Sequence, residues 1–118
     1  MKDLAPHIYR QRLLIEGFYG IAANEKVIKR YFAHIVKVLK LRVYGDPVIH
    51  VTSGVGKESN QGYDAFVPLI DSGIYVGVWA NHTFLSTIIY TCKKFDEKKA
   101  LLSTKKFWKI MKAESKSF

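Results

Sequence analysis

Residues 25–41, EKVIKRYFAHIVKVLKL, decide the fold class, because this one segment combines two opposite faces. Apolar side chains recur at steps of three and four residues, and Lys and Arg fill the gaps between them. On a helix this spacing gathers the apolar groups on one side. Asn24 can cap such a helix, and Glu25 complements the helix dipole in the first turn. The segment is therefore predicted to be an amphipathic helix that buries one face.

Outward from this helix, the chain consists of β-rich runs separated by turn residues. A second helix is predicted over 97–112, capped by Asp96. The order of elements predicts an α+β fold class: a two-layer sandwich with a mainly antiparallel sheet and two helices on one face. The chain length fits a single domain, 1–118, with residues 1–12 as a short N-terminal arm. The predicted strands are residues 13–19, 48–53, 65–70, 74–80 and 84–92.

The net charge of +9 lies on the flanks of the chain. Residues 1–42 and 93–118 each hold nine Lys and Arg against three acids, whereas residues 43–92 hold one lysine against four acids. Two helices with lysines on their solvated faces would account for this pattern. A basic surface that attracts nucleic acid or an acidic partner protein is the alternative.

The sequence carries no signal for a membrane, a disulfide or a metal. Residues 1–12 lack the apolar core of a signal peptide, and no apolar run reaches the roughly 18 residues of a membrane span, so a cytoplasmic protein is expected. Cys92 is the only cysteine, so an internal disulfide and a cysteine-based zinc cluster are excluded. No metal site is expected, because the histidines have no ligand spacing. They are His7, His34, His50 and His82.

Five features in residues 48–92 occur together at fixed spacing. They are Val51-Thr52-Ser53, Gly62, Asp71-Ser72, Trp79 and Thr91-Cys92. This block resembles the prokaryotic S-adenosylmethionine (AdoMet) decarboxylases, which are pyruvoyl-dependent enzymes of polyamine biosynthesis. The resemblance extends upstream through the first predicted strand and helix. It implies a homodimer with sites near the subunit boundary, and the short chain also leaves one sheet face poor in charge.

The resemblance implies roles for three residues. In that family a serine attacks its own preceding peptide bond and becomes a pyruvoyl group, which forms a Schiff base with substrate and accepts electrons as carbon dioxide leaves. A cysteine then returns a proton to the carbanion. By position, Ser72 is the pyruvoyl precursor, Asp71 holds the carbonyl to be attacked, and Cys92 is the proton donor. From the residues alone, the favoured interpretation is that Ser72 lies in a tight Asp-Ser-Gly turn and that Cys92 is a small buried apolar residue.

Four positions depart from the family pattern. Asp64 stands where the family has a second serine that takes part in self-processing, and Gly73 and Gly77 stand where it has histidines. Glu58 stands where an aromatic ring stacks on adenine, beside the substrate-binding position of Trp79. A carboxylate offers no π face for stacking. Asp64 has the chemistry to act as a substitute base.

These departures predict a divergent AdoMet decarboxylase-like paralogue with impaired self-processing. It would hold a pyruvoyl cofactor only if Ser72 is processed. An active pyruvoyl-dependent decarboxylase acting on AdoMet or another amino-acid substrate is one alternative. A basic, non-catalytic binding module for nucleic acid or an acidic partner is the other.

Overall fold

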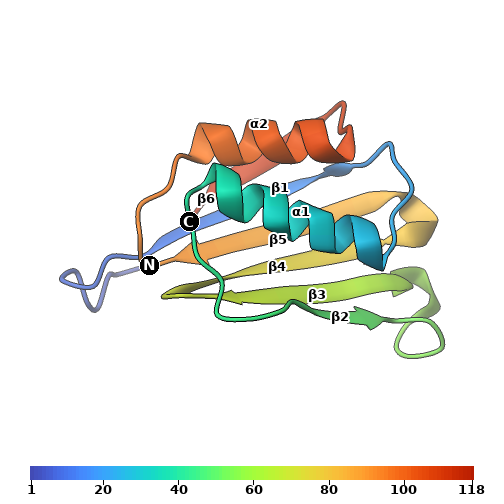
Figure 1. The fold of residues 1–118 in the computed structure, drawn as a ribbon, viewed down its shortest axis with the longest axis horizontal. Coiled ribbons are helices and arrows are strands. Elements are labelled where there is room, and N and C mark those ends of the chain that lie inside the picture. Colours follow the sequence, from blue (N-terminus) through green and yellow to red (C-terminus); the bar gives the residue numbers. More distant parts are fainter.

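Antiparallel pairing joins six strands in the order β2-β3-β4-β5-β1-β6, and two helices cover one face of the sheet (Figure 1). The computed structural model describes residues 1–118. This arrangement confirms the predicted α+β sandwich. The strands are β1 (Gln11–Phe18), β2 (Val48–Val51), β3 (Gly62–Leu69), β4 (Ser72–Trp79), β5 (Phe84–Thr91) and β6 (Ala113–Ser117), and the helices are α1 (Glu25–Val38) and α2 (Glu97–Trp108).

Side-chain caps begin both helices where the sequence predicts them. Asn24 Oδ1 accepts a hydrogen bond from the amide of Val27 at 2.9 Å, and Asp96 Oδ1 accepts one from the amide of Lys99 at 3.1 Å. The apolar face of α1 packs on the sheet and contributes to one core cluster of 22 buried residues. Neither helix is long and apolar enough to cross a membrane.

Both helices were predicted to be too long at their C-terminal ends. The first was expected to reach residue 41, but α1 ends at Val38. The second helix was expected to reach residue 112, but α2 ends at Trp108 because Lys109 adopts a left-handed conformation with φ 51°. Residues 113–117 then form β6, which pairs with β1. This edge strand was not predicted, because AESKS lacks apolar alternation. It lies at the sheet edge with four of its five residues exposed.

Tyr31 links the two helices inside the core. Its hydroxyl shares a 2.8 Å hydrogen bond with Thr104 Oγ1 of α2, and the side chain is fully buried. Burial disfavours the phenolate and raises the pKa of Tyr31 to about 12. A pKa above the unfolded value of 10.0 contributes stability that is present below pH 10 and is lost as the pH rises toward 12.

We therefore expect the free energy of unfolding to fall by about 2 kcal/mol more in the wild type than in Tyr31→Phe between pH 8 and pH 11.5. Urea unfolding followed by circular dichroism at both pH values measures this difference. Tyr44→Phe is the control, since Tyr44 is 70% exposed. If Tyr31→Phe keeps the full alkaline loss, ionisation of Tyr31 does not cause it.

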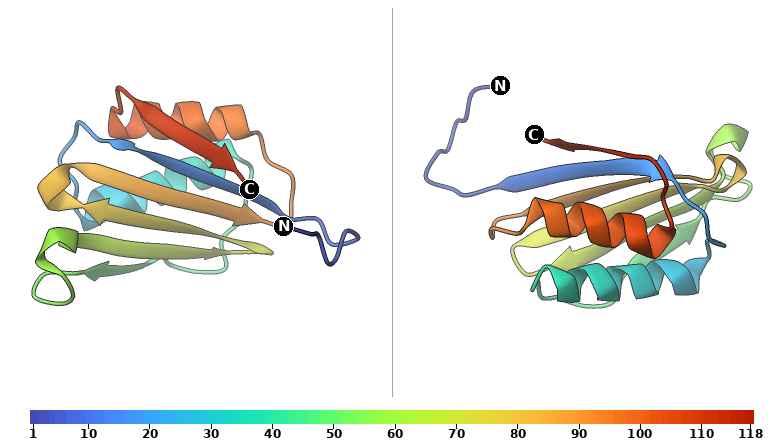
Figure 2. Two further views of the ribbon diagram at one scale, coloured as in Figure 1. Left: turned by 180° about the vertical axis from the view of Figure 1, so that it is seen from behind. Right: turned by 90° about the horizontal axis from the view of Figure 1, so that it is seen from above.

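The opposite face of the sheet carries no helix (Figure 2, left). Large apolar side chains are exposed across it, and we call this surface the open face. Its exposed apolar residues, placed there by strand register, are Phe18, Val48, Phe66, Tyr90 and Phe118. The open face also carries Tyr75, Trp79 and Phe84, which alternate along β4 and β5 with residues of the core face.

Candidate active site

The turn between β3 and β4 brings together three of the predicted site residues. Leu69 and Ser72 form the last pair of the hairpin, and Asp71 lies in the turn with φ 64°. On the other side of β4, Ser72 pairs with Thr91, so Cys92 follows directly beside the turn. The amide of Cys92 donates a 3.0 Å hydrogen bond to the carbonyl oxygen of Asp71. One backbone donor therefore already points at the carbonyl that precedes Ser72.

The hydroxyl of Ser72 has no group to take its proton. Ser72 Oγ is buried and has no hydrogen-bond partner. Successive side chains of β4 point to opposite faces of the sheet, so Ser72 lies on the same face as Ile74. Ile74 is fully buried under the helices. Cys92, in contrast, is exposed and free.

Asp64 lies elsewhere on the sheet, on the open face. It pairs across the strands with Gly77, and its Oδ1 accepts a 3.0 Å hydrogen bond from the hydroxyl of Tyr75. Burial, aided by the neighbouring carboxylate, raises the pKa of Tyr75 to about 12. Gly77 is five residues along β4 from Ser72, a distance of about 16 Å. Within one chain, Asp64 and Ser72 are therefore not brought together.

Aromatic rings cover Gly73 and Gly77, the two glycines for which the resemblance predicts histidine positions. A Cβ on Gly73 would lie 2.6 Å from Cζ of Phe66, which is too close for real atoms. A Cβ on Gly77 would lie 2.8 Å from the hydroxyl oxygen of Tyr75 and 3.0 Å from Cζ3 of Trp79. The space that side chains at positions 73 and 77 would need is thus taken by neighbouring aromatic residues.

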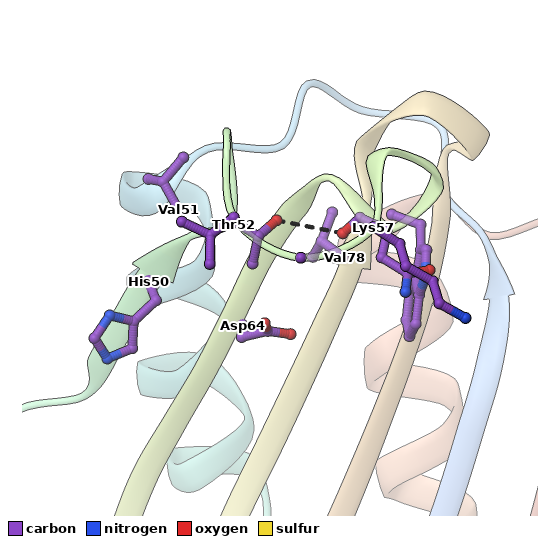
Figure 3. Close-up of a pocket in the computed structure, with 10 residues that line it drawn as sticks. His50, Val51, Thr52, Lys57, Asp64 and Val78 are labelled. Carbon is purple, nitrogen blue, oxygen red and sulfur yellow. Dashed lines mark hydrogen bonds between the residues drawn. The ribbon is translucent and has the colours of Figure 1, made fainter.

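Trp79 borders a cavity of about 460 Å³ at the far end of β4, beside the loop between β2 and β3 (Figure 3). Asp64, Lys57 and Asn60 also line this cavity. The indole Nε1 of Trp79 donates a 3.0 Å hydrogen bond to Asn60 Oδ1. Glu58 begins a short 3₁₀ turn and is exposed, and it is not among the lining residues.

The loop beside this cavity is held by side chains that sequence reasoning missed. Gln61 donates to the carbonyls of Val55 and Lys57 at 3.0 and 2.8 Å and accepts from the amide of Gly54 at 3.0 Å. Thr52 Oγ1 accepts a 2.7 Å hydrogen bond from the amide of Gly62. A polar, glycine-rich segment flanked by an amide side chain is a recognisable signal for such a closed loop, although the partners depend on the fold.

The scattered histidines stay apart in the structure. His50 pairs with Asp64 across β2 and β3 and lines the same cavity as Lys57 (Figure 3), with no second histidine among the lining residues. No three His, Cys, Asp or Glu side chains gather in a way that could hold a metal ion.

The fold matches a known class of structure, the AdoMet decarboxylase-like sandwich. The adenosylmethionine decarboxylase from Aquifex aeolicus VF5 is similar with a TM-score of 0.71 over 94% of this chain and 89% of that chain, at 17% sequence identity. No protein-family model and no curated protein matches the sequence. The structural likeness establishes the fold that this chain shares with that enzyme.

Proposed function

We propose that this chain is a divergent AdoMet decarboxylase-like protein, related to the enzymes of polyamine metabolism, that folds without cleaving itself. The observation that carries the proposal is the packing of aromatic side chains over Gly73 and Gly77. Phe66 covers Gly73, and Tyr75 and Trp79 enclose Gly77, so the family's two histidines are replaced by glycines whose neighbours occupy the vacated space.

The chemistry of cleavage supports the same proposal. Ser72 Oγ would have to attack the Asp71 carbonyl, and the resulting oxyanion would need hydrogen-bond donors. The amide of Cys92 supplies one donor at 3.0 Å. No side chain of the same molecule hydrogen-bonds to Ser72 Oγ to take its proton. The residues present therefore do not fit the formation of a pyruvoyl group.

Intact mass spectrometry tests this proposal on the purified wild-type chain. We expect one species of full mass, because a missing base and a missing oxyanion donor each slow the reaction by about 10²-fold or more. The control is Ser72→Ala, which cannot be processed and should give the same single-species spectrum. Two wild-type fragments divided between Asp71 and Ser72 would refute the proposal.

An active pyruvoyl-dependent decarboxylase is the second candidate, because one observation favours it. Asp71, Ser72 and Cys92 remain adjacent, with the Cys92 amide bound to the carbonyl that would be attacked. Asp64 could act on this turn only from another molecule, since it lies about 16 Å away along the strand in its own chain. The same mass spectrum separates the two candidates.

We also propose that the open face joins two copies of the chain. Phe18, Phe66 and Tyr90 are 61%, 45% and 41% exposed there, which is unusual for aromatic residues in an isolated chain. The helices on the other face and the segments adjoining them carry most of the lysines, so two copies repel least when their open faces meet. A symmetric contact of this kind would bury the same apolar surface on both partners.

Light scattering should therefore report twice the mass of the 13.5 kDa chain. Phe18→Lys/Tyr90→Lys should convert this dimer into a monomer, because two lysines per copy would be desolvated in the contact. Leu102→Lys is the matched control, since Leu102 is 64% exposed on α2, away from the open face. A wild-type monomer at high micromolar concentration, or a dimer that survives the double substitution, would contradict this interface.

A further inference from the structure

The positive charge of the molecule is confined to one layer. We define the helix layer as residues 25–40 and 93–112, which comprise both helices and the segments adjoining them. It contains thirteen of the 19 Lys and Arg residues and three of the ten acids, a net charge of +10. The rest of the chain holds six basic and seven acidic residues, a net charge of −1. The open face and the helix layer therefore differ sharply in electrostatic potential.

Helical spacing turns these cations toward solvent. Lys26, Arg30 and Lys37 lie within about 40° of one another around α1, on the side opposite the buried Ile28 and Ile35. All three are exposed. On α2, pairs of lysines recur seven residues apart and return to the same side of the helix. These pairs are Lys98 with Lys105 and Lys99 with Lys106.

Carboxylates of the same molecule do not neutralise this layer. The only ion pair in the structure, Arg10 with Asp3, belongs to the N-terminal arm. Asp96 Oδ1 accepts from a backbone amide as a helix cap, and Glu97 Oε2 accepts from Gln11 and Ser117. The carboxylates at the start of α2 thus accept hydrogen bonds from uncharged groups and form no ion pairs with the lysines. The lysine charges therefore remain available to a partner.

We propose that the helix layer binds the phosphate backbone of duplex nucleic acid without sequence preference. Its thirteen cations are all exposed or partly exposed. Eight lie on α1 and α2, which run side by side (Figure 2, right), and five lie in the adjoining segments. A 14-residue helix is about 21 Å long, a length over which a duplex presents roughly twelve phosphates. Lysines bind phosphate as point charges, and twelve of the thirteen cations are lysines, so the contacts carry no base readout.

Other anionic partners fit this surface less well. Protein interfaces are poor in lysine and need buried aromatic or apolar anchors, and the helix layer offers only Leu102 and Met111 as large exposed apolar residues. A membrane-binding helix inserts an apolar face, but the apolar face of α1 is already buried against the sheet. Exposed lysines that release counterions from a polyanion are sufficient for nonspecific duplex binding.

Fluorescence anisotropy with a labelled 20-base-pair DNA duplex of random sequence tests the proposal on the full chain. We expect binding at 50 mM NaCl that weakens steeply and log-linearly with added salt. Arg30→Glu/Lys37→Glu on α1 should weaken binding at least tenfold and reduce the salt slope by about two. Lys99→Glu/Lys106→Glu on α2 should do the same, which guards against a folding defect in one helix.

The matched control is Lys2→Glu/Lys116→Glu, which changes the net charge equally but lies outside the helix layer. It should retain binding within about twofold of the wild type, since only nearby charges contact phosphate. Circular dichroism melting checks that all variants fold. Absence of duplex binding at 50 mM NaCl, or equal losses in control and helix variants, would overturn the proposal. Polyglutamate or phosphatidylserine vesicles that bind more tightly than the duplex would also overturn it, in favour of another partner.

Discussion

The variant Asp64→Ser/Tyr75→Ala/Gly77→His should divide into residues 1–71 and 72–118, whereas the wild-type chain should stay whole. The serine and histidine restore the two side chains that the resemblance assigns to self-processing. Tyr75→Ala removes the hydroxyl that lies 2.8 Å from a Cβ at position 77, the nearest of the atoms that an imidazole there would meet; the Trp79 ring, at 3.0 Å, would have to shift. Because a positioned base contributes about 10²–10⁴ and an oxyanion donor about 10²–10³ in rate, cleavage should become detectable by intact mass.

Two controls make this result interpretable. Asp64→Ser/Gly77→His without Tyr75→Ala should cleave less, because the Tyr75 ring and Trp79 still enclose position 77. Adding Ser72→Ala to the triple variant should abolish cleavage. Since residues 64 and 77 lie about 16 Å along the strand from Ser72, the reaction should also require two copies and accelerate with protein concentration. A triple variant that remains whole when dimeric would show that the missing groups are not what prevents cleavage.

Replacing Gly62 by alanine should cause the largest loss of stability of any glycine substitution in this chain. A Cβ at this position would lie 1.8 Å from the carbonyl oxygen of Val78, and the carbonyl belongs to backbone that cannot rotate away. The φ of +157° adds strain for a residue with a side chain. We expect a loss of about 3–5 kcal/mol, which corresponds to a decrease in melting temperature of roughly 10–20 °C.

Thermal unfolding followed by circular dichroism measures this loss. Gly45→Ala is the matched control, because a Cβ at Gly45 meets nothing within 4 Å and its melting temperature should change by little. If Gly62→Ala melted within a few degrees of the wild type, the close approach of β3 and the end of β4 at this residue would be refuted.

The sequence was sufficient for the elements whose stabilisation is local. The apolar residues that recur at steps of three and four in 25–41 identified α1, because all residues of its apolar face come from one contiguous segment of the sequence. The β-rich runs identified β1 to β5 for the same reason. β6 could not be found in this way, since AESKS is held by backbone pairing to β1 rather than by its own side chains.

The candidate site shows the same division. The positions of Asp71 and Ser72 in a turn follow from local sequence, and Cys92 was expected at the end of a strand. The contact between the Asp71-Ser72 turn and Cys92 depends on the register of β4 with β5. This register cannot be inferred from a single sequence. The covering of Gly73 by Phe66 depends on diagonal packing between β3 and β4, so it too emerges only from the folded sheet.

The two edges of the sheet have a consequence for how the molecule avoids aggregation. At one edge β2 is only four residues long and follows Pro47, and at the other β6 presents Glu114 and Lys116, so neither edge is a good template for further pairing. The neighbour of β6 in the sheet is β1, which is eight residues long and includes the apolar run Leu13-Leu14-Ile15. A protease that cut the chain between α2 and β6 and released the terminal strand would expose the backbone of β1 to other molecules. Fibrous or amorphous self-association should then follow from the loss of five mostly polar residues.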